Sequence, residues 1–256
     1  MSVPITRPGF DIAVVVPVRR GSSRIREKCL LPFGERASLI EWKLAQLVQV
    51  IAPERIWLSS EDEEFLAIGA AFGISLHRRP AHLARGHDAP FRDVITGIVR
   101  DIPHRHIAWA TVVCPLMAPQ DYASAFAAYR RAVLAGEHDS LLGVNEARDY
   151  YWSRGGALNY SASREHTISQ DLPDWFRVTN SLYMAPRALM LEREYLLGER
   201  PLLHVLPKIA GIDIDTHEDY RMACALHALY CEEAAGDETG NKAGGARDER
   251  LATCES

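Results

Sequence analysis

The sequence predicts an α/β protein with a Rossmann-like, mainly parallel sheet that has helices on both faces. Apolar runs typical of buried strands alternate with segments of helical periodicity through most of the 256 residues, the order expected of repeated strand–helix units. The clearest run, residues 12–18, leads directly into a cluster of Arg, Gly and Ser. Hydrophobic residues make up 47% of the chain, enough for one large core. We therefore expect a single α/β domain.

The helices are expected between these strands. Residues 38–51 predict the first helix, and Ser60 with Glu63 three residues later predicts the start of a second one, because this pair can form a capping box. Residues 90–101 and 120–135 also have helical periodicity. The expected strands are 12–18, 55–59, 106–114, 139–145, 178–185 and 210–214.

The last third of the chain departs from the alternation twice. Residues 146–177 are rich in aromatic, Arg and Ser residues, and a stretch of that length without clear periodicity is usually an excursion from the main sheet. A second capping box, Thr216 with Asp219, predicts a final helix, after which the chain becomes rich in Gly, Ala and charge. We expect a domain over residues 1–232 that includes a small arm at about 146–177, followed by a disordered tail over 233–256.

Composition excludes several classes of protein. The formal charge of −5 and the pI near 6.1 argue against a nucleic-acid partner, and no apolar run reaches the roughly 18 residues of a membrane span. The five Cys residues have no C-x-x-C spacing, which fits reduced thiols in a cytoplasmic protein. His77, His82 and His87 match no metal-ligand spacing, so we expect them to be surface residues.

The loop after the first strand has the composition of a polyphosphate site. A glycine lets the main chain approach an anion closely, hydroxyl groups add donors, and Arg and Lys neutralise several charges. The spacing is not that of a Walker A loop; the alternative is a solvated basic turn, in which Arg24 pairs with Glu27. The candidate anion-binding residues are Arg19, Gly21, Ser22, Ser23, Arg24 and Lys28.

Asp213 and Asp215 form the candidate metal site. Side chains two residues apart on a strand project to the same face, so both carboxylates can bind one hard cation such as Mg²⁺. Ligands of open α/β sheets lie at the carboxyl ends of strands, where both this pair and the basic loop are expected. The alternative is that Asp215 helps to cap the last helix and Asp213 is solvated.

Residues 16–30, V-P-V-R-x-G-S-S-R-I-x-x-K-x-L, resemble the nucleotide-binding loop of the sugar-acid cytidylyltransferases, which make CMP-sialic acid and CMP-Kdo. Four further segments resemble that family in order and spacing, so the resemblance covers about residues 11–231. They are Ser59–Asp62 (family S-T-D-D), Arg79–Asp88 (R-P-x-x-L-A-x-D), Asp171–Tyr183 (D-L-P followed by N-G-x-x-Y) and Ile212–Thr216 (I-D-I-D-T).

The resemblance implies a fold of the nucleotide-diphospho-sugar transferase type and a CTP-dependent enzyme with Mg²⁺ that joins CMP to a small acidic acceptor. It implies a homodimer in which the arm crosses to the partner subunit. Arg19 and Lys28 would hold the triphosphate and stabilise the leaving pyrophosphate, with Asp215 or a metal-bound water as proton acceptor. The further residues implied are Arg79 and Asp88 for the nucleotide and Asn180 and Tyr183 for the acceptor; alternatively, Arg79 is a loop residue and Asp88 a helix cap.

The sequence departs from the family on the acceptor side. Cys29 replaces an Asn, Thr111–Met117 differs from the family's Q-P-T-S-P-L-R, and Ser169 stands where an Arg is usual. Ser cannot replace the bidentate contact of Arg with a carboxylate, so the acceptor could be another nonulosonic acid, an eight-carbon sugar acid or a phosphonate. Two other functions stay open, a glycosyltransferase of related fold and a degenerate nucleotide-binding regulatory module.

Overall fold

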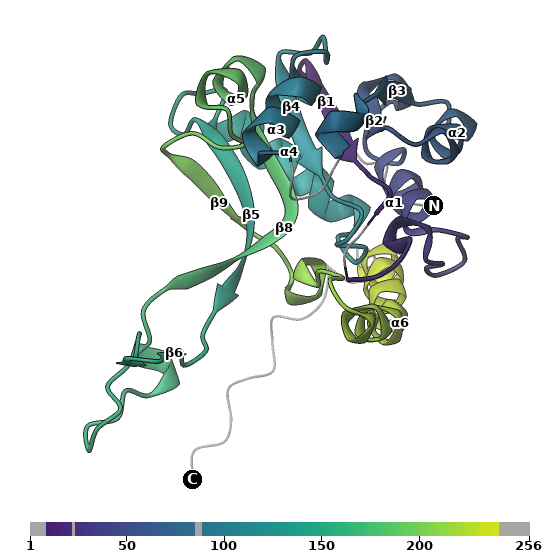
Figure 1. Ribbon diagram of the computed structural model, residues 1–256. Coiled ribbons are helices and arrows are strands. Elements are labelled where there is room, and N and C mark those ends of the chain that lie inside the picture. The colour runs from purple at the N-terminus through teal and green to yellow at the C-terminus, as the bar shows by residue number, and fades with distance from the viewer. Residues whose placement is uncertain (1–8, 22–23, 85–88, 241–256) are drawn as a thin grey trace.

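The computed structural model describes residues 9–21, 24–84 and 89–240, and its centre is a seven-stranded sheet (Figure 1). The strand order is β3-β2-β1-β4-β8-β5-β9. Every neighbouring pair is parallel except those made by β8, which runs antiparallel to β4 and to β5. The strands are β1 Ile12–Pro17, β2 Ile56–Ser60, β3 Ser75–Arg78, β4 His106–Ala110, β5 Ser140–Ala147, β8 Trp175–Pro186 and β9 Pro201–Val205.

Helices cover both faces of the sheet, as expected. Alternate residues of β1 face different cores: Val14 and Val16 pack in the larger cluster, whereas Ala13 and Val15 pack in the smaller one, as the two-residue period of a strand requires. The larger cluster lies against α1 Leu39–Leu47, α2 Glu63–Ala71, α4 Pro119–Ala132 and α6 His217–Gly240, and the smaller one against α3 Phe91–Val99 and α5 Arg187–Arg193.

The strand order reverses direction at β1. The chain proceeds from β1 to β2 and β3 on one side and then returns to β4 on the other side. The loops that leave β1 and β4 therefore diverge, and the crevice between them at the carboxyl ends of the strands is where open α/β sheets bind ligands. Val18–Gly21 and Thr111–Pro115 begin these two loops.

Residues 210–214, expected as a strand, do not form one. A 3₁₀ helix over Lys208–Gly211 is followed by an extended segment, which is joined to the loop after β4 by a hydrogen bond from the Ile214 amide to the Val113 carbonyl (2.8 Å). The segment is apolar because Ala210 and Ile214 are buried in the larger core and not because it belongs to the sheet. β3 and β9 were not expected: β3 is polar at most positions, and β9 is an edge strand with half-exposed side chains.

The helix caps are partly as expected. Asp62, and not Ser60, caps α2 by accepting from the amides of Glu64 and Phe65, because Ser60 is still the last, buried residue of β2. The capping box of α6 is confirmed, since Thr216 Oγ1 accepts from the Asp219 amide and the Asp219 carboxylate accepts from the Thr216 amide.

His77 is buried, contrary to the expected surface position. Its ring bonds to Ser59 Oγ (2.9 Å) and to the Asp101 carboxylate (3.2 Å), an arrangement that joins β2, β3 and the end of α3. Ser59 is itself fully buried, so this Ser-His-Asp grouping is structural. His82 is exposed, and His87 lies outside the described residues.

The arm extends away from the sheet between the ends of β5 and β8 (Figure 1). It contains a short hairpin of β6 Trp152–Ser153 and β7 Gly156–Ala157. Several of its large apolar side chains are exposed, among them Trp152 at 63% and Ile168 at 54%.

The C-terminal boundary differs from the expectation. α6 continues to Gly240, so residues 233–240, expected to be disordered, are helical; Glu and Ala, which are frequent there, are strong helix formers. Residues 241–256 lie outside the described part of the chain. Within the described ranges, no helix has the length and apolar character needed to cross a membrane.

Candidate active site

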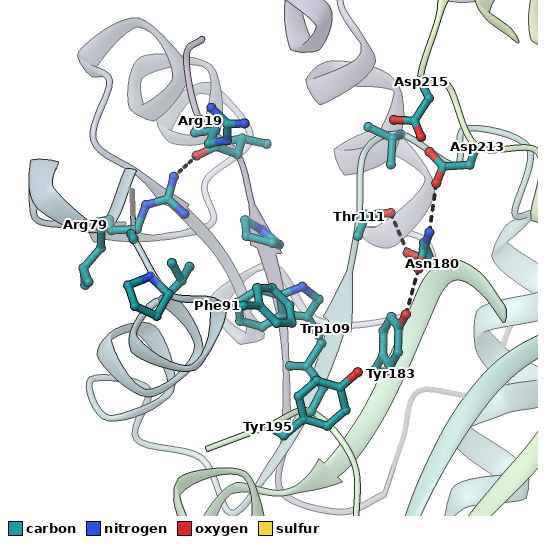
Figure 2. Close-up of a pocket in the computed structure, with 18 of the residues that line it drawn as sticks. Arg19, Arg79, Phe91, Trp109, Thr111, Asn180, Tyr183, Tyr195, Asp213 and Asp215 are labelled. Carbon is teal, nitrogen blue, oxygen red and sulfur yellow. Dashed lines mark hydrogen bonds between the residues drawn. The ribbon is translucent and has the colours of Figure 1, made fainter. Parts of the chain in front are cut away.

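A cavity of about 720 Å³ lies at the carboxyl ends of β1 and β4 (Figure 2). Figure 2 shows Arg19 and Arg79 on one side of it, Asp213 and Asp215 on the other, and Trp109 between them. The wall thus changes from cationic through aromatic to acidic. The residues that line the cavity and matter below are Arg19, Arg24, Arg79, Phe91, Trp109, Thr111, Val113, Asn180, Tyr183, Tyr195, Asp213 and Asp215.

The basic loop begins directly after β1 and turns towards the acidic segment. Gly21 has a positive φ of 90°, a conformation that glycine adopts without strain, and the Arg19 side chain bonds to its carbonyl oxygen. Lys28 Nζ donates to the Ile214 carbonyl (2.7 Å) and lies 3.4 Å from Asp215 Oδ1. Ser22 and Ser23 lie outside the described residues.

Arg24 also contacts the acidic segment. Its Nη2 lies 2.7 Å from Asp215 Oδ1, so the pairing with Glu27 considered from the sequence is wrong: Glu27 instead bonds to Arg20. The basic loop and the acidic segment, far apart in the sequence, are thus brought together. Of the two cations that contact Asp215, Arg24 is exposed, as in a solvated turn, whereas the Lys28 side chain is only 12% exposed.

Arg79 is buried and forms an ion pair, so it is not a plain loop residue. Its Nη2 donates to the Val18 carbonyl (2.5 Å) and to Glu61 Oε2 (2.9 Å). Glu61 Oε1 in turn accepts from the Arg20 amide (2.9 Å). Arg79 and Glu61 therefore hold the main chain at both ends of Arg19. Asp88 lies outside the described residues.

Sequence reasoning missed the contribution of Glu61 and Arg20. Arg20 makes ion pairs with Glu27, Asp62 and Glu64 and lies over the Phe65 ring, 5.0 Å from its centre. The signal in the sequence was the Ser59–Asp62 segment itself, in which two acidic residues directly follow a buried strand. Glu61 and Asp62 hold the basic loop in place through their contacts with Arg20.

Asp213 and Asp215 have different surroundings. Asp213 Oδ2 accepts from Asn180 Nδ2 (3.1 Å), whereas its Oδ1 is buried and has no hydrogen-bond partner in the described part of the chain. Burial raises the pKa of Asp213 above its ordinary value, although the Asn180 bond opposes this. An unsatisfied buried carboxylate oxygen costs free energy, and a bound cation would satisfy it.

The pair fits a hard cation that is shared with a substrate. Magnesium in nucleotide enzymes is usually held by one or two carboxylates, with phosphate oxygens and waters as the other ligands. No group of three or more His, Cys, Asp or Glu side chains suited to a metal occurs among the described residues. The helix cap of α6 comes from Thr216 and Asp219, so Asp215 is not needed as a cap.

Asn180 and Tyr183 lie together beside the acidic pair. Tyr183 donates to Asn180 Oδ1 (2.8 Å), and the Asn180 carbonyl accepts from Thr111 Oγ1 (2.8 Å). Asn180 has a left-handed backbone with φ 57°, which turns its side chain towards Asp213. Burial raises the pKa of Tyr183 to about 12, so its hydroxyl remains a neutral donor at physiological pH.

The departures from the family pattern have different structural settings. Met117 is fully buried in the larger core, so this position cannot face a ligand in the cavity. Ser169 lies on the arm in a short 3₁₀ helix over Ser169–Asp171. Burial raises the pKa of the Cys29 thiol despite Lys28 beside it, so Cys29 is not an activated nucleophile.

The chain is similar to known cytidylyltransferases. A family model described as cytidylyltransferase matches residues 13–133. A pseudaminic acid cytidylyltransferase of Campylobacter jejuni is 22% identical over 86% of this chain and 97% of its own length. An N-acylneuraminate cytidylyltransferase of Escherichia coli is 19% identical over 84% of this chain and 52% of its own length.

Solved structures share the fold. The structure of a CMP:2-keto-3-deoxy-manno-octonic acid synthetase complexed with CTP superposes with a TM-score of 0.59 at 16% identity, covering 86% of this chain and 99% of the other. A 4-diphosphocytidyl-2C-methyl-D-erythritol synthase superposes with a TM-score of 0.57 at 9% identity, covering 85% and 99%.

The family match over residues 13–133 and the names of the relatives together indicate the class of protein, a nucleotidyltransferase. More particularly, residues 13–133 match the cytidylyltransferase model, and the chain is similar to sugar-acid cytidylyltransferases at about one fifth sequence identity.

Proposed function

We propose that this protein transfers CMP from CTP to an acidic sugar of the nonulosonic acid type and releases pyrophosphate. The observation that carries the proposal is the meeting of Arg24 and Lys28 with Asp215 at the edge of a nucleotide-sized cavity. Cations for a triphosphate and carboxylates for Mg²⁺ are the two components that phosphoryl transfer requires. The pseudaminic and N-acylneuraminate relatives support the choice of acceptor class.

The nucleotide would bind across the loops that leave β1 and β4. Arg19 and Lys28 would contact the phosphates, Gly21 would allow close approach of the main chain, and Arg79 with Glu61 would keep the loop in place. A polyphosphate would compete with Asp215 for Arg24 and Lys28, because all three groups now form ion pairs. Ser22, Ser23 and Asp88 remain expected contributors.

Asp213 and Asp215 would hold Mg²⁺, which when bound neutralises phosphate charge and aligns the reacting oxygens. The acceptor hydroxyl would attack the α-phosphorus in line, with Asp215 placed to take its proton. A bond would form between the acceptor oxygen and phosphorus while the bond to the β-phosphate oxygen breaks. The departing pyrophosphate would receive its charge stabilisation from Arg19 and Lys28.

The acceptor would lie towards Asn180, Tyr183 and the aromatic end of the cavity formed by Trp109, Phe91 and Tyr195. Within the described residues, Arg177 is engaged with Asn145 and the Gly211 carbonyl, so it has little freedom to bind the acceptor carboxylate. Arg154 and Arg164 lie on the exposed arm. They would reach an acceptor only in the site of another subunit.

We further propose a two-fold symmetric homodimer in which each arm closes the acceptor end of the partner's cavity. The support is the exposed apolar surface of the arm, which includes Trp152, Ile168, Trp175 and Phe176, since aromatic anchors are frequent in subunit interfaces.

Reduced thiols and the composition also support a cytoplasmic location.

A pyrophosphate-release assay tests the function. Purified protein, CTP and Mg²⁺ are incubated with pseudaminic acid, N-acetylneuraminate, Kdo or a small phosphonate, and the CMP product is identified by mass. Turnover with one nonulosonic acid and loss of turnover in Asp213→Asn would support the proposal. Turnover with only Kdo or only the phosphonate would show that the acceptor belongs to that class and not to the nonulosonic acids. No pyrophosphate release with any acceptor would contradict the transferase activity.

The glycosyltransferase alternative is less well supported. It would use Asp213 and Asp215 for the metal of a sugar nucleotide, but it gives no role to the bonds from Arg24 and Lys28 to the same segment. Hydrolysis or transfer from a sugar nucleotide in the same assay would reveal it.

A further inference from the structure

Lys43 is a lysine in the middle of the larger core. It lies on α1, and its side chain is fully buried. Nζ donates to the Cys114 carbonyl (2.9 Å) and bonds to the Tyr122 hydroxyl (2.8 Å). Both partners are uncharged, and burial lowers the pKa of Lys43 to about 7. A methionine would fill similar space without this desolvation cost, so the lysine must contribute something besides packing.

The carbonyl that Lys43 binds belongs to the loop after β4, which is connected to the active site at three points. Thr111 Oγ1 donates to the Asn180 carbonyl (2.8 Å), and the Val113 carbonyl accepts from the Ile214 amide (2.8 Å). The third contact is from Cys114 Sγ to the carbonyl of the residue before Asn180 (3.2 Å). This loop therefore determines where Asn180 and Ile214 lie, and these two residues flank Asp213.

Other side chains of α1 hold the next carbonyl of the same loop. Trp42 Nε1 and Gln46 Nε2 donate to the Pro115 carbonyl at 2.7 and 2.8 Å. The Cys114 carbonyl is the one nearer to Val113, and Lys43 is the side chain that binds it. Loss of this donor would leave a buried carbonyl unsatisfied, and the loop would shift to find another partner.

We propose that Lys43 is a positioning residue for the transfer reaction. By fixing the Cys114 carbonyl it sets the positions of Thr111 and Val113, and through them those of Asn180 and Ile214 beside Asp213. Lys43 lies within the core and contacts neither nucleotide nor acceptor. The kinetic part of this inference rests on the proposed function.

The test compares three variants. Lys43→Met keeps the length of the side chain and removes the donor. Lys43→Gln keeps a donor and removes the charge. Tyr122→Phe is the matched control, because it removes the other partner of the same amine and leaves the Cys114 bond in place.

We expect Lys43→Met to lower kcat at least tenfold while KM for CTP stays within threefold, since the basic loop is untouched. Lys43→Gln and Tyr122→Phe should both keep kcat within threefold. A change in overall stability alone would affect Tyr122→Phe as well. The inference is overturned if Lys43→Met retains kcat within twofold, or if Tyr122→Phe is equally impaired. If Lys43→Met does not fold, a folded Lys43→Gln protein with kcat lowered more than tenfold overturns it.

Hydrogen exchange gives a second measurement that needs no activity. The Ile214 amide, which is bonded to Val113, should exchange at least tenfold faster in Lys43→Met than in the wild type and at an unchanged rate in Tyr122→Phe. Equal exchange in Lys43→Met and wild type would refute the positioning role. If the wild type shows no transfer with any acceptor, the proposed function fails, and the exchange rates still decide the role of Lys43.

Discussion

Lys28 Nζ lies 2.7 Å from the carbonyl oxygen of Ile214, a residue far along the chain. This bond joins the loop after β1 to the segment that contains both acidic residues of the cavity. Arg24 adds an ion pair with Asp215, but its side chain is 60% exposed, whereas that of Lys28 is 12% exposed. The two cations therefore differ in how strongly they are desolvated, and Coulomb interactions are stronger where water is excluded.

Removal of Lys28 should affect turnover more than removal of Arg24. We expect Lys28→Ala and Arg19→Ala to lower kcat by a factor of a hundred or more, because one contact with developing charge is commonly worth about 3 kcal/mol. Arg24→Ala removes an exposed ion pair and should lower kcat by less than tenfold. Steady-state kinetics with CTP measures all three. Equal losses in Arg24→Ala and Lys28→Ala would contradict this ranking.

Replacement of the acidic pair should separate metal binding from folding. Asp213→Asn and Asp215→Asn should each weaken Mn²⁺ binding in the presence of CTP by at least tenfold and reduce turnover below detection. The melting temperature should change by only a few degrees, since the Asp215 side chain is 39% exposed and Asp213 has a buried oxygen without a hydrogen-bond partner among the described residues. Electron paramagnetic resonance titration and a melting curve provide the two measurements. Full Mn²⁺ affinity in the double variant would show that the metal site lies elsewhere.

The stability of the protein should depend on pH through Lys43. Its pKa is about 7 in the folded state, against an ordinary value of 10.5, so between these values the unfolded chain binds one proton more than the folded one. Stability should therefore rise with pH from about 7 to 10, by up to roughly 1.4 kcal/mol per pH unit. Lys43→Met lacks this contribution. Denaturant unfolding at pH 6, 7, 8 and 9 measures the difference, and parallel curves for the two proteins would refute a buried, titrating lysine.

The exposed side chains of the arm should determine the oligomeric state. Trp152→Ala combined with Ile168→Ser removes two of the most exposed apolar groups of the arm, and we expect the dimer to dissociate at least a hundredfold more readily. The β6–β7 hairpin of the arm lies away from the helices and from most of the main sheet (Figure 1), so far-ultraviolet circular dichroism should be unchanged. Sedimentation velocity measures the state. A wild-type protein that is already monomeric at high concentration would exclude the dimer.

The sequence predicted the elements that local patterns specify. Apolar runs identified β1, β2, β4, β5 and β8, and the pair Thr216–Asp219 identified the start of α6, because these signals depend on a few adjacent residues. Edge strands such as β3 and β9 are not buried on both faces, so they lack the continuous apolar run that identifies a buried strand.

The site was predictable in its parts but not in its connections. From residue types the sequence predicted an anion site at the basic loop and a metal site at Asp213 and Asp215; both stay predictions, and the structure shows that Arg24 and Lys28 of this loop contact Asp215. That Lys28 donates to Ile214, or that Glu61 holds the Arg20 amide and Arg79, depends on long-range packing. The prediction of a strand at 210–214 is wrong because burial in the core and pairing in a sheet give the same apolar pattern, and the sequence does not distinguish them.

Within the seven-stranded sheet, β8 is the strand that runs antiparallel to its neighbours, and it also links the arm to the cavity. Trp175 and Phe176 at its start belong to the arm, whereas Asn180 and Tyr183 a few residues later line the cavity. The pairing of β8 with β5 is interrupted between Val178 and Tyr183, where Asn180 lies. A shift of one residue in the pairing on the arm side, which reverses side-chain faces there, would displace Asn180 relative to Asp213. If the acceptor binds at Asn180 and Tyr183 as proposed, residues outside the cavity that set this pairing would also change which acid is activated.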